Sequence, residues 1–260
     1  MTTTTQTTTP TPPAPRRPRT LRTVLLVVGS VLLAAVLLLV GLQVASAGDD
    51  QDHSRTTTVG ETVDRLTVDA AATDVTIRRA DVDRPRIVFA AGDTRLRERH
   101  SVRDGALTVE VTGPGWGITD LSIGVRRGAD LTIELPRAAT GTPVRVETTA
   151  GDVTLTGRYG AVDLTSTQGD VSVSGSAEAV TVTATSGDVG LDLGTAPSRI
   201  TVDTTSGDQE VRLPRGEYAI TAETTVGDVE NALGTDPDAD RRYRFTAVAG
   251  DVDVEAGDAR

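Results

Sequence analysis

Residues 162–173 read VDLTSTQGDVSV and residues 180–191 read VTVTATSGDVGL, and these two stretches decide the fold. In both, apolar residues alternate with polar ones on either side of a Gly-Asp dipeptide. Alternation with a period of two is typical of a β-strand with one buried face. Val and Thr suit such a strand because their branched Cβ atoms pack well on a pleated surface. Each stretch therefore predicts a strand, a turn and a second short strand.

The same unit recurs through the C-terminal half of the chain, at spacings of 18, 18, 20, 20 and 23 residues. Self-similarity at a nearly fixed period indicates stacked repeats. One unit of this length holds two short strands and two turns, and it cannot bury its apolar face without a neighbour. The turn glycines are Gly151, Gly169, Gly187, Gly207, Gly227 and Gly250.

Two all-β topologies fit this pattern. Glycine supplies the positive φ of a two-residue type II′ turn, which by itself suggests an antiparallel β-meander or roll. Repetition of the whole unit instead favours a β-solenoid of strand–turn–strand coils of about 18–20 residues, in which equivalent strands stack. We expect the solenoid, preceded by one transmembrane helix.

The transmembrane helix is predicted from residues 24–42, VLLVVGSVLLAAVLLLVGL, which carry no charge. Nineteen apolar residues in a helix cross about 30 Å of hydrocarbon. The charged side chains before residue 45 are Arg16, Arg17, Arg19 and Arg22, so the positive-inside rule keeps the N-terminus in the cytoplasm. A signal peptide cleaved after Ala47 is the alternative, but the apolar stretch is longer than the usual 7–15 residues or so. An uncleaved signal anchor is the favoured interpretation.

Four segments follow from this assignment. Residues 1–22, rich in Thr and Pro, are expected to form a disordered cytoplasmic tail, because they have almost no apolar side chains for a core. Residues 23–43 form the anchor and residues 44–58 a polar linker. Residues 59–256 form an extracytoplasmic β-strand-repeat domain, which places the protein in the cell membrane as a single-pass protein.

Composition excludes several functions. The chain has no Cys, so a catalytic thiol, a zinc–cysteine site and disulfides are impossible. Its 26 basic residues are all Arg, against 37 acidic ones. After residue 45 the balance is 22 − 37 = −15, with no basic stripe interleaved with aromatics, which disfavours nucleic-acid binding. We predict no catalytic residue and no cofactor.

The aspartates of the Gly-Asp turns form the main constellation of candidate site residues. A solenoid would bring them to equivalent corners about 4.8 Å apart. Carboxylates that close need donors, arginines or cations, and a calcium ladder is one hypothesis. The simpler interpretation is that each carboxylate accepts hydrogen bonds from backbone N–H groups of the turn. A glycosidase using a pair of these carboxylates is a weaker hypothesis. The residues are Asp152, Asp170, Asp188, Asp208, Asp228 and Asp251.

Residues 95–100 read RLRERH, a basic patch in an acidic domain. Such a patch could contact an anionic polymer or lipid. The simpler interpretation is an exposed face whose charge is balanced by nearby acids.

The motif LTIELP at residues 131–136, followed by repeats of V-x-V-x-T-x-x-G-D-V, resembles a bacterial β-strand-repeat domain of unknown function that carries the label "putative adhesin". The resemblance covers Val59 to Val254 and implies a β-solenoid without known catalytic residues. Some members occur near cell-envelope stress systems. The absence of Lys and the abundance of Ala, Gly, Thr and Val are typical of a G+C-rich genome such as that of an actinobacterium.

We therefore expect a non-enzymatic, envelope-anchored, adhesin-like binding or scaffolding protein. Its partners would be the membrane and a cell-wall polymer or envelope protein, because long repeated faces suit extended partners. The alternative is an accessory or sensor protein of envelope-stress signalling, in which residues 1–20 report the state of the outer domain.

Overall fold

A computed structural model describes residues 54–92, 94–113 and 128–257. These residues form two β-sheets, and no helix occurs among them. The strand β2 (Arg65–Ala80) belongs to both sheets, because residues 65–70 pair with β5 and residues 73–80 pair with β6.

The pairings give each sheet a fixed strand order. Sheet A runs β1 (Ser54–Thr58), β3 (Arg86–Ala90), β6 (Ala129–Pro136), β2, β8 (Val153–Arg158), β10 (Val171–Ser176), β12 (Val189–Leu193), β14 (Gln209–Leu213), β18 (Val252–Ala256) and β16 (Val229–Asn231). Sheet B runs β4 (Arg97–Arg103), β5 (Ala106–Thr112), β2, β7 (Val144–Ala150), β9 (Ala161–Gln168), β11 (Ala179–Ser186), β13 (Arg199–Ser206), β17 (Arg242–Ala249) and β15 (Ala219–Val226).

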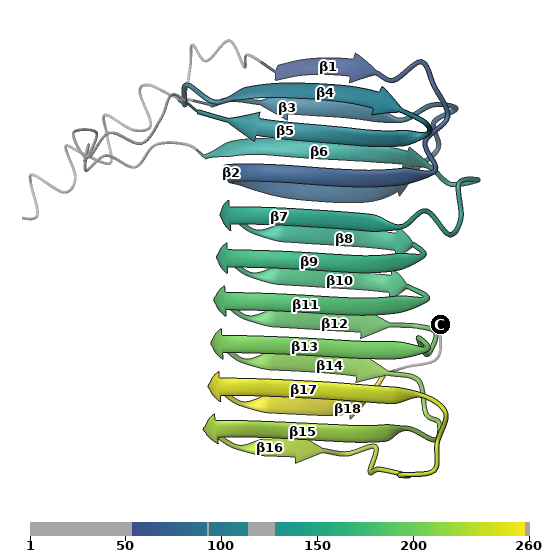
Figure 1. The fold of residues 1–260 in the computed structure, drawn as a ribbon, viewed down its shortest axis with the longest axis vertical. Coiled ribbons are helices and arrows are strands. Elements are labelled where there is room, and N and C mark those ends of the chain that lie inside the picture. The colour runs from purple at the N-terminus through teal and green to yellow at the C-terminus, as the bar shows by residue number, and fades with distance from the viewer. Residues whose placement is uncertain (1–53, 93, 114–127, 258–260) are drawn as a thin grey trace, which may run out of the picture. The chain divides into compact units, whose positions relative to one another are not determined.

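Each repeat is one coil with a strand in either sheet, and the Gly-Asp turn joins the two strands. The strands on the two sides of a turn, such as β9 and β10, lie in different sheets and pair with the coils above and below (Figure 1). These pairings are parallel, with Val162 facing Val180 and Val171 facing Val189. The predicted stacking of coils is confirmed. The antiparallel meander is wrong for the repeats, because a turn between two sheets leaves its flanking strands unpaired with each other.

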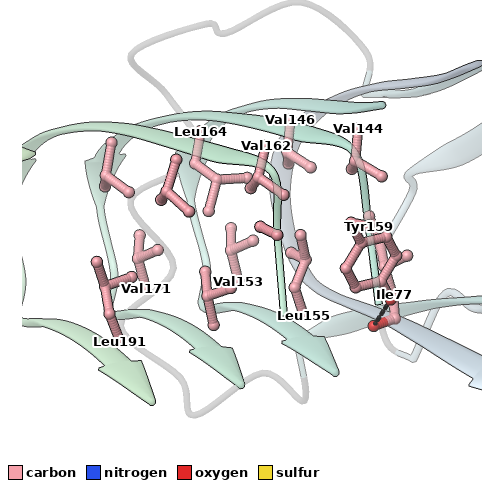
Figure 2. Packing of buried hydrophobic residues seen from close by; sticks show 14 of the residues in the cluster. Ile77, Val144, Val146, Val153, Leu155, Tyr159, Val162, Leu164, Val171 and Leu191 are labelled. Atoms are coloured by element: carbon pink, nitrogen blue, oxygen red, sulfur yellow. Dashed lines mark hydrogen bonds between the residues drawn. The ribbon is translucent and has the colours of Figure 1, made fainter. Parts of the chain in front are cut away.

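The core lies between the two sheets. Inward-facing residues of successive coils stack in aliphatic columns, Val144 beside Val162 in sheet B and Val153 beside Val171 in sheet A, and the two sheets face each other across this core (Figure 2). All four are 1–2% exposed. Burying a Val or Leu side chain fully contributes about 1.5–3 kcal/mol relative to leaving it in water, so repetition of the column stabilises the stack.

Antiparallel strands occur at one end of the stack. In sheet A, β3 pairs antiparallel with β6 and β1 pairs antiparallel with β3. In sheet B, β4 pairs antiparallel with β5. This end therefore departs from the regular coil, and β1 and β4 are its outermost strands among the described residues.

The order of the coils differs from the order of the chain at the other end. The last coil, β17–β18, lies between β13–β14 and β15–β16 (Figure 1). The outermost coil is thus the one before it in sequence. A solenoid that followed the order of the chain would instead place β15–β16 on β13–β14.

The inserted coil is the more apolar of the two. Tyr243 and Phe245 are 1% and 0% exposed, whereas the equivalent positions of β15 hold Ile220 and Ala222. In sheet A the inserted coil presents Val254 where the outermost coil presents Asn231. Burying the coil with the larger apolar side chains on both sides removes more apolar surface from water.

Polar contacts fix the inserted coil in place. The buried Gln209 side chain donates from Nε2 to the backbone oxygen of Thr246 in β17 at 2.9 Å. The Tyr243 hydroxyl donates to the backbone oxygen of Pro197 at 2.8 Å, and its ring lies 5.0 Å from that of Tyr218.

The predicted transmembrane segment lies outside the described residues. Within the part of the chain that the structure describes, no helix has the length and hydropathy needed to cross a membrane.

Candidate functional site

The predicted corner aspartates lie along one edge of the stack, joined by a seventh, Asp74. In six of the seven, the Oδ1 atom accepts a hydrogen bond from the backbone N–H of the aspartate in the adjacent coil, at 2.8–2.9 Å; Asp228, the last in the row, donates its N–H to Asp251. The order along the edge is Asp74, Asp152, Asp170, Asp188, Asp208, Asp251 and Asp228. We call this row the aspartate ladder.

Asp74 was not predicted as a member of the ladder, because Thr73 stands where the repeats have Gly. The signal that identifies it is the sequence DVTI at residues 74–77, which matches DVTL at residues 152–155. The two segments also align in the structure, where Val75 faces Val153.

The turn glycines stack beside the ladder. Gly207, with φ of 136°, has the carbonyl oxygen of Gly187 so close that any Cβ atom at residue 207 would lie within 3.0 Å of it. The same relation holds between Gly169 and Gly151. Glycine is therefore required twice over, by its positive φ and by the close approach of the neighbouring coil.

The hydrogen bonds of the aspartate ladder give its carboxylates a structural role. One oxygen of Asp170 satisfies the N–H of Asp188, which joins consecutive coils at the corner. Among the described residues, no group of three or more His, Cys, Asp or Glu side chains could hold a metal ion. The hydrogen bonds between neighbouring aspartates therefore account for the regular row without a calcium ion or a glycosidase carboxylate pair.

We expect Asp170→Ala to lower the free energy of unfolding by about 1–2 kcal/mol, because it removes a charge-assisted hydrogen bond between coils. Asp170→Asn should lose less, since the amide oxygen still accepts. Chemical denaturation of the variants measures both effects. Asp203→Ala is the matched control, because Asp203 is exposed on the outer face of β13. Equal losses for Asp170→Ala and Asp203→Ala would contradict a structural role of the ladder.

A second polar cluster ties β2 to the repeats. The guanidinium of Arg79 lies 4.7 Å from the centre of the Tyr159 ring and donates from Nε to the backbone oxygen of Arg158. The Tyr159 hydroxyl donates to the backbone oxygen of Ile77 at 3.0 Å (Figure 2). Burial raises the pKa of Tyr159 to about 12, so its hydroxyl stays a neutral donor.

Some arginines on the sheets form ion pairs with acidic side chains of the described residues, namely Arg78, Arg86, Arg145 and Arg212. Arg145 pairs with Glu147 and Asp163 across the outer face of sheet B. In β4, by contrast, Glu98 pairs with His100, at 2.8 Å between Oε1 and Nδ1. The arginines of this segment are exposed and form no ion pair in the described part of the chain; they are Arg95, Arg97, Arg99 and Arg103. We call them the β4 arginine strip.

The predicted balance of the basic patch by nearby acids stays a prediction: Glu110 of β5 faces Arg99, but Glu98 does not pair with these arginines. Alternation along the strand explains why: Arg97 and Arg99 project to one face of β4, and Glu98 projects to the other with His100. A hollow of about 560 Å³ beside the strip is lined by Arg95, Leu96, Arg97, Arg99, Thr112 and Gly113. The arrangement suits anionic groups, which arginine binds through its planar fork of N–H donors.

Comparison with solved structures finds similar folds in bacterial proteins. A "putative cell adhesion protein" from Clostridium sporogenes is 11% identical over 78% of this chain and 98% of its own, with a TM-score of 0.47. A "putative adhesin" from Bacteroides fragilis is 14% identical over 78% and 95%, with a TM-score of 0.44. Another from Parabacteroides distasonis is 13% identical over 80% and 98%, with a TM-score of 0.40.

No curated protein matches the sequence. A family model, however, matches residues 61–255, which extend from before β2 to the penultimate residue of β18. That match confirms the resemblance to a bacterial β-strand-repeat domain, and the chain belongs to the Toastrack DUF4097 family.

Proposed function

We propose that this protein is a non-enzymatic binding or scaffolding protein of the cell envelope. Residues 23–43 would anchor it in the membrane, with the β-stack outside and residues 1–22 in the cytoplasm. The anchor and this orientation follow from the uncharged stretch at 24–42 and the arginines before it.

The observation that carries the proposal is the regular outer face of sheet B. Outward positions of successive coils align across the sheet, as Thr165, Thr183 and Asp203 do in β9, β11 and β13. All three side chains are exposed. A face on which successive coils present polar side chains at equivalent positions offers hydroxyl and carboxylate groups many times over, which suits an extended or repetitive partner such as a wall polymer.

The aspartate ladder supports a scaffold rather than a catalyst. The corner carboxylates from Asp74 to Asp251 along the edge make the same bond to the next coil, so none of them is set apart as an acid or a base. Glycosidases place two carboxyl groups in different environments, because one must stay protonated while the other is ionised. A row of equivalent carboxylates lacks that distinction.

The test is co-sedimentation of the full chain, held in lipid nanodiscs, with isolated cell-wall sacculi and with empty nanodiscs as the control. Saturable binding to sacculi is expected. Repeating the assay with calcium and with EDTA shows whether cations on the ladder take part. Binding no greater than that of empty nanodiscs would overturn the wall-binding role. The signalling alternative would then be supported by a requirement for residues 1–20 in intact cells, because an anchored binding protein does not need that tail.

A further inference from the structure

The β4 arginine strip occupies an outer edge of the fold. Strand β4 pairs with β5, and its opposite edge has no partner strand among the described residues. Four exposed arginines that form no ion pair with another described residue lie within nine residues, at Arg95, Arg97, Arg99 and Arg103. Alternate residues of a strand are about 6.6–6.8 Å apart, so the strip presents a row of separate guanidinium groups.

Charge is distributed unevenly along the stack. Residues 54–112, which build the end that contains β1 and β4, hold ten arginines and ten acidic residues. Residues 199–257, which build the opposite end, hold six arginines and thirteen acidic residues. The β4 end therefore carries no net charge (10 − 10 = 0) and the opposite end carries 6 − 13 = −7, so an anionic surface repels the opposite end more strongly.

The chain itself limits how far the β4 end lies from the membrane. The uncharged stretch ends at residue 42 and β1 begins at Ser54, which leaves eleven residues between them. Eleven residues span at most about 40 Å when fully extended. Strand β1 is the outer strand of sheet A at the same end of the stack at which β4 is the outer strand of sheet B. The first described residues thus lie at the end that carries the strip.

We propose that the β4 arginine strip binds the anionic phospholipid headgroups of the membrane in which the chain is anchored. The stack then stands on the membrane by its β4 end and presents its acidic end outward. This inference rests on the membrane anchor of the proposed function. The planar guanidinium group binds phosphate oxygens through two parallel N–H donors. Each arginine held near an anionic bilayer increases binding about fivefold.

The experiment places the full chain in nanodiscs of phosphatidylglycerol or of phosphatidylcholine. Phenylglyoxal labels exposed arginines, and peptide mass spectrometry reads the rate at each site. We expect labelling of Arg97, Arg99 and Arg103 to slow at least about fivefold in phosphatidylglycerol, and the difference to vanish in molar salt, which shortens the Debye length to about 3 Å. Arg199, Arg242 and Arg244 are exposed arginines of β13 and β17 and serve as internal controls, with equal rates in both lipids.

Two triple variants complete the test by hydrogen exchange of the β4 amides in phosphatidylglycerol. In the first, Arg97, Arg99 and Arg103 become Gln, and we expect exchange to rise to the rate seen in phosphatidylcholine. In the second, Arg199, Arg242 and Arg244 become Gln, and protection should persist. Equal labelling rates in both lipids would overturn the inference. So would binding to sacculi that requires the β4 arginine strip but does not change with the lipid. Failure of the chain to enter nanodiscs at all would instead contradict the anchor.

Discussion

Replacement of Gly207 by alanine is expected to lower the free energy of unfolding by about 3–5 kcal/mol. The residue has φ of 136°, a conformation that costs a residue with a Cβ atom about 1–3 kcal/mol. The new methyl group would also lie within 3.0 Å of two backbone atoms of Gly187, which no side-chain rotation can relieve. Overpacking of that kind adds about 1–3 kcal/mol. Urea or thermal denaturation measures the loss.

Gly234→Ala is the matched control for this prediction. Gly234 also has a positive φ, of 74°, but nothing lies within 4 Å of the position that its Cβ would take. Its replacement should therefore lower the free energy of unfolding only by the cost of placing a Cβ atom at positive φ, about 1–2 kcal/mol. If the two variants lose the same stability, the close stacking of the Gly-Asp corners is not what holds the coils together.

Phe245→Ala is expected to destabilise the protein by about 3–5 kcal/mol, the usual range for removing a fully buried Phe. The side chain is 0% exposed and is flanked by Val202 of β13 on one side and Ala222 of β15 on the other. Because Ala222 is small, it cannot fill the space that the ring leaves. Equilibrium denaturation followed by circular dichroism gives the change.

The control is Val248→Ala, three residues along the same strand. Val248 is 52% exposed, and its truncation should change stability by no more than about 0.5 kcal/mol. A small effect of Phe245→Ala would mean that β17 lies at the end of the stack, where a ring has a neighbour on one side only.

The coils could be predicted from the sequence because local pattern and tertiary packing agree in them. Val162 and Leu164 alternate with polar residues, and the glycine and aspartate that follow turn the chain into the other sheet. Every coil repeats this arrangement, so the register of one pair of strands fixes the register of the next. The pairing of these strands could therefore be predicted from the repeat alone, without knowledge of other contacts between distant residues.

The order of the last two coils could not be predicted in this way. Gly227 and Gly250 begin the same local turn, and either coil can pair with β13 and β14 through its backbone. What distinguishes the coils is how much apolar surface each one buries, with Phe245 in one and Ala222 in the other. The order of the coils therefore depends on comparing the apolar surface of two segments, and the period of the repeat alone does not predict it.

The lack of pairing between Glu98 and the β4 arginine strip could not be predicted from the sequence for a different reason. The sequence displays the basic patch together with Glu98 and Glu110, which suggests that the charges balance. In the part of the chain that the structure describes, Glu98 pairs with His100, and Arg97 and Arg99 form no ion pair. Strand alternation would have separated Arg97 from Glu98, had residues 97–103 been assigned as a strand from their sequence.

The central claim of this account is a stack of parallel coils in which the last coil lies one layer in from the end. The absence of cysteine from the chain allows a direct test by pairs of introduced cysteines. Thr201 faces Arg244, which in turn faces Thr221. Adjacent strands lie about 4.8 Å apart, whereas Thr201 and Thr221 are two strands apart, beyond the roughly 7 Å limit for a disulfide. The pair of Thr181 and Thr201, which face each other in β11 and β13, is the positive control.

We predict rapid oxidation of the Thr201→Cys/Arg244→Cys variant and of the control pair, as judged by the mobility of the unreduced protein. The Thr201→Cys/Thr221→Cys variant should remain reduced under the same conditions. A disulfide between positions 201 and 221, with none between 201 and 244, would contradict the account, because the coils would then stack in the order of the chain.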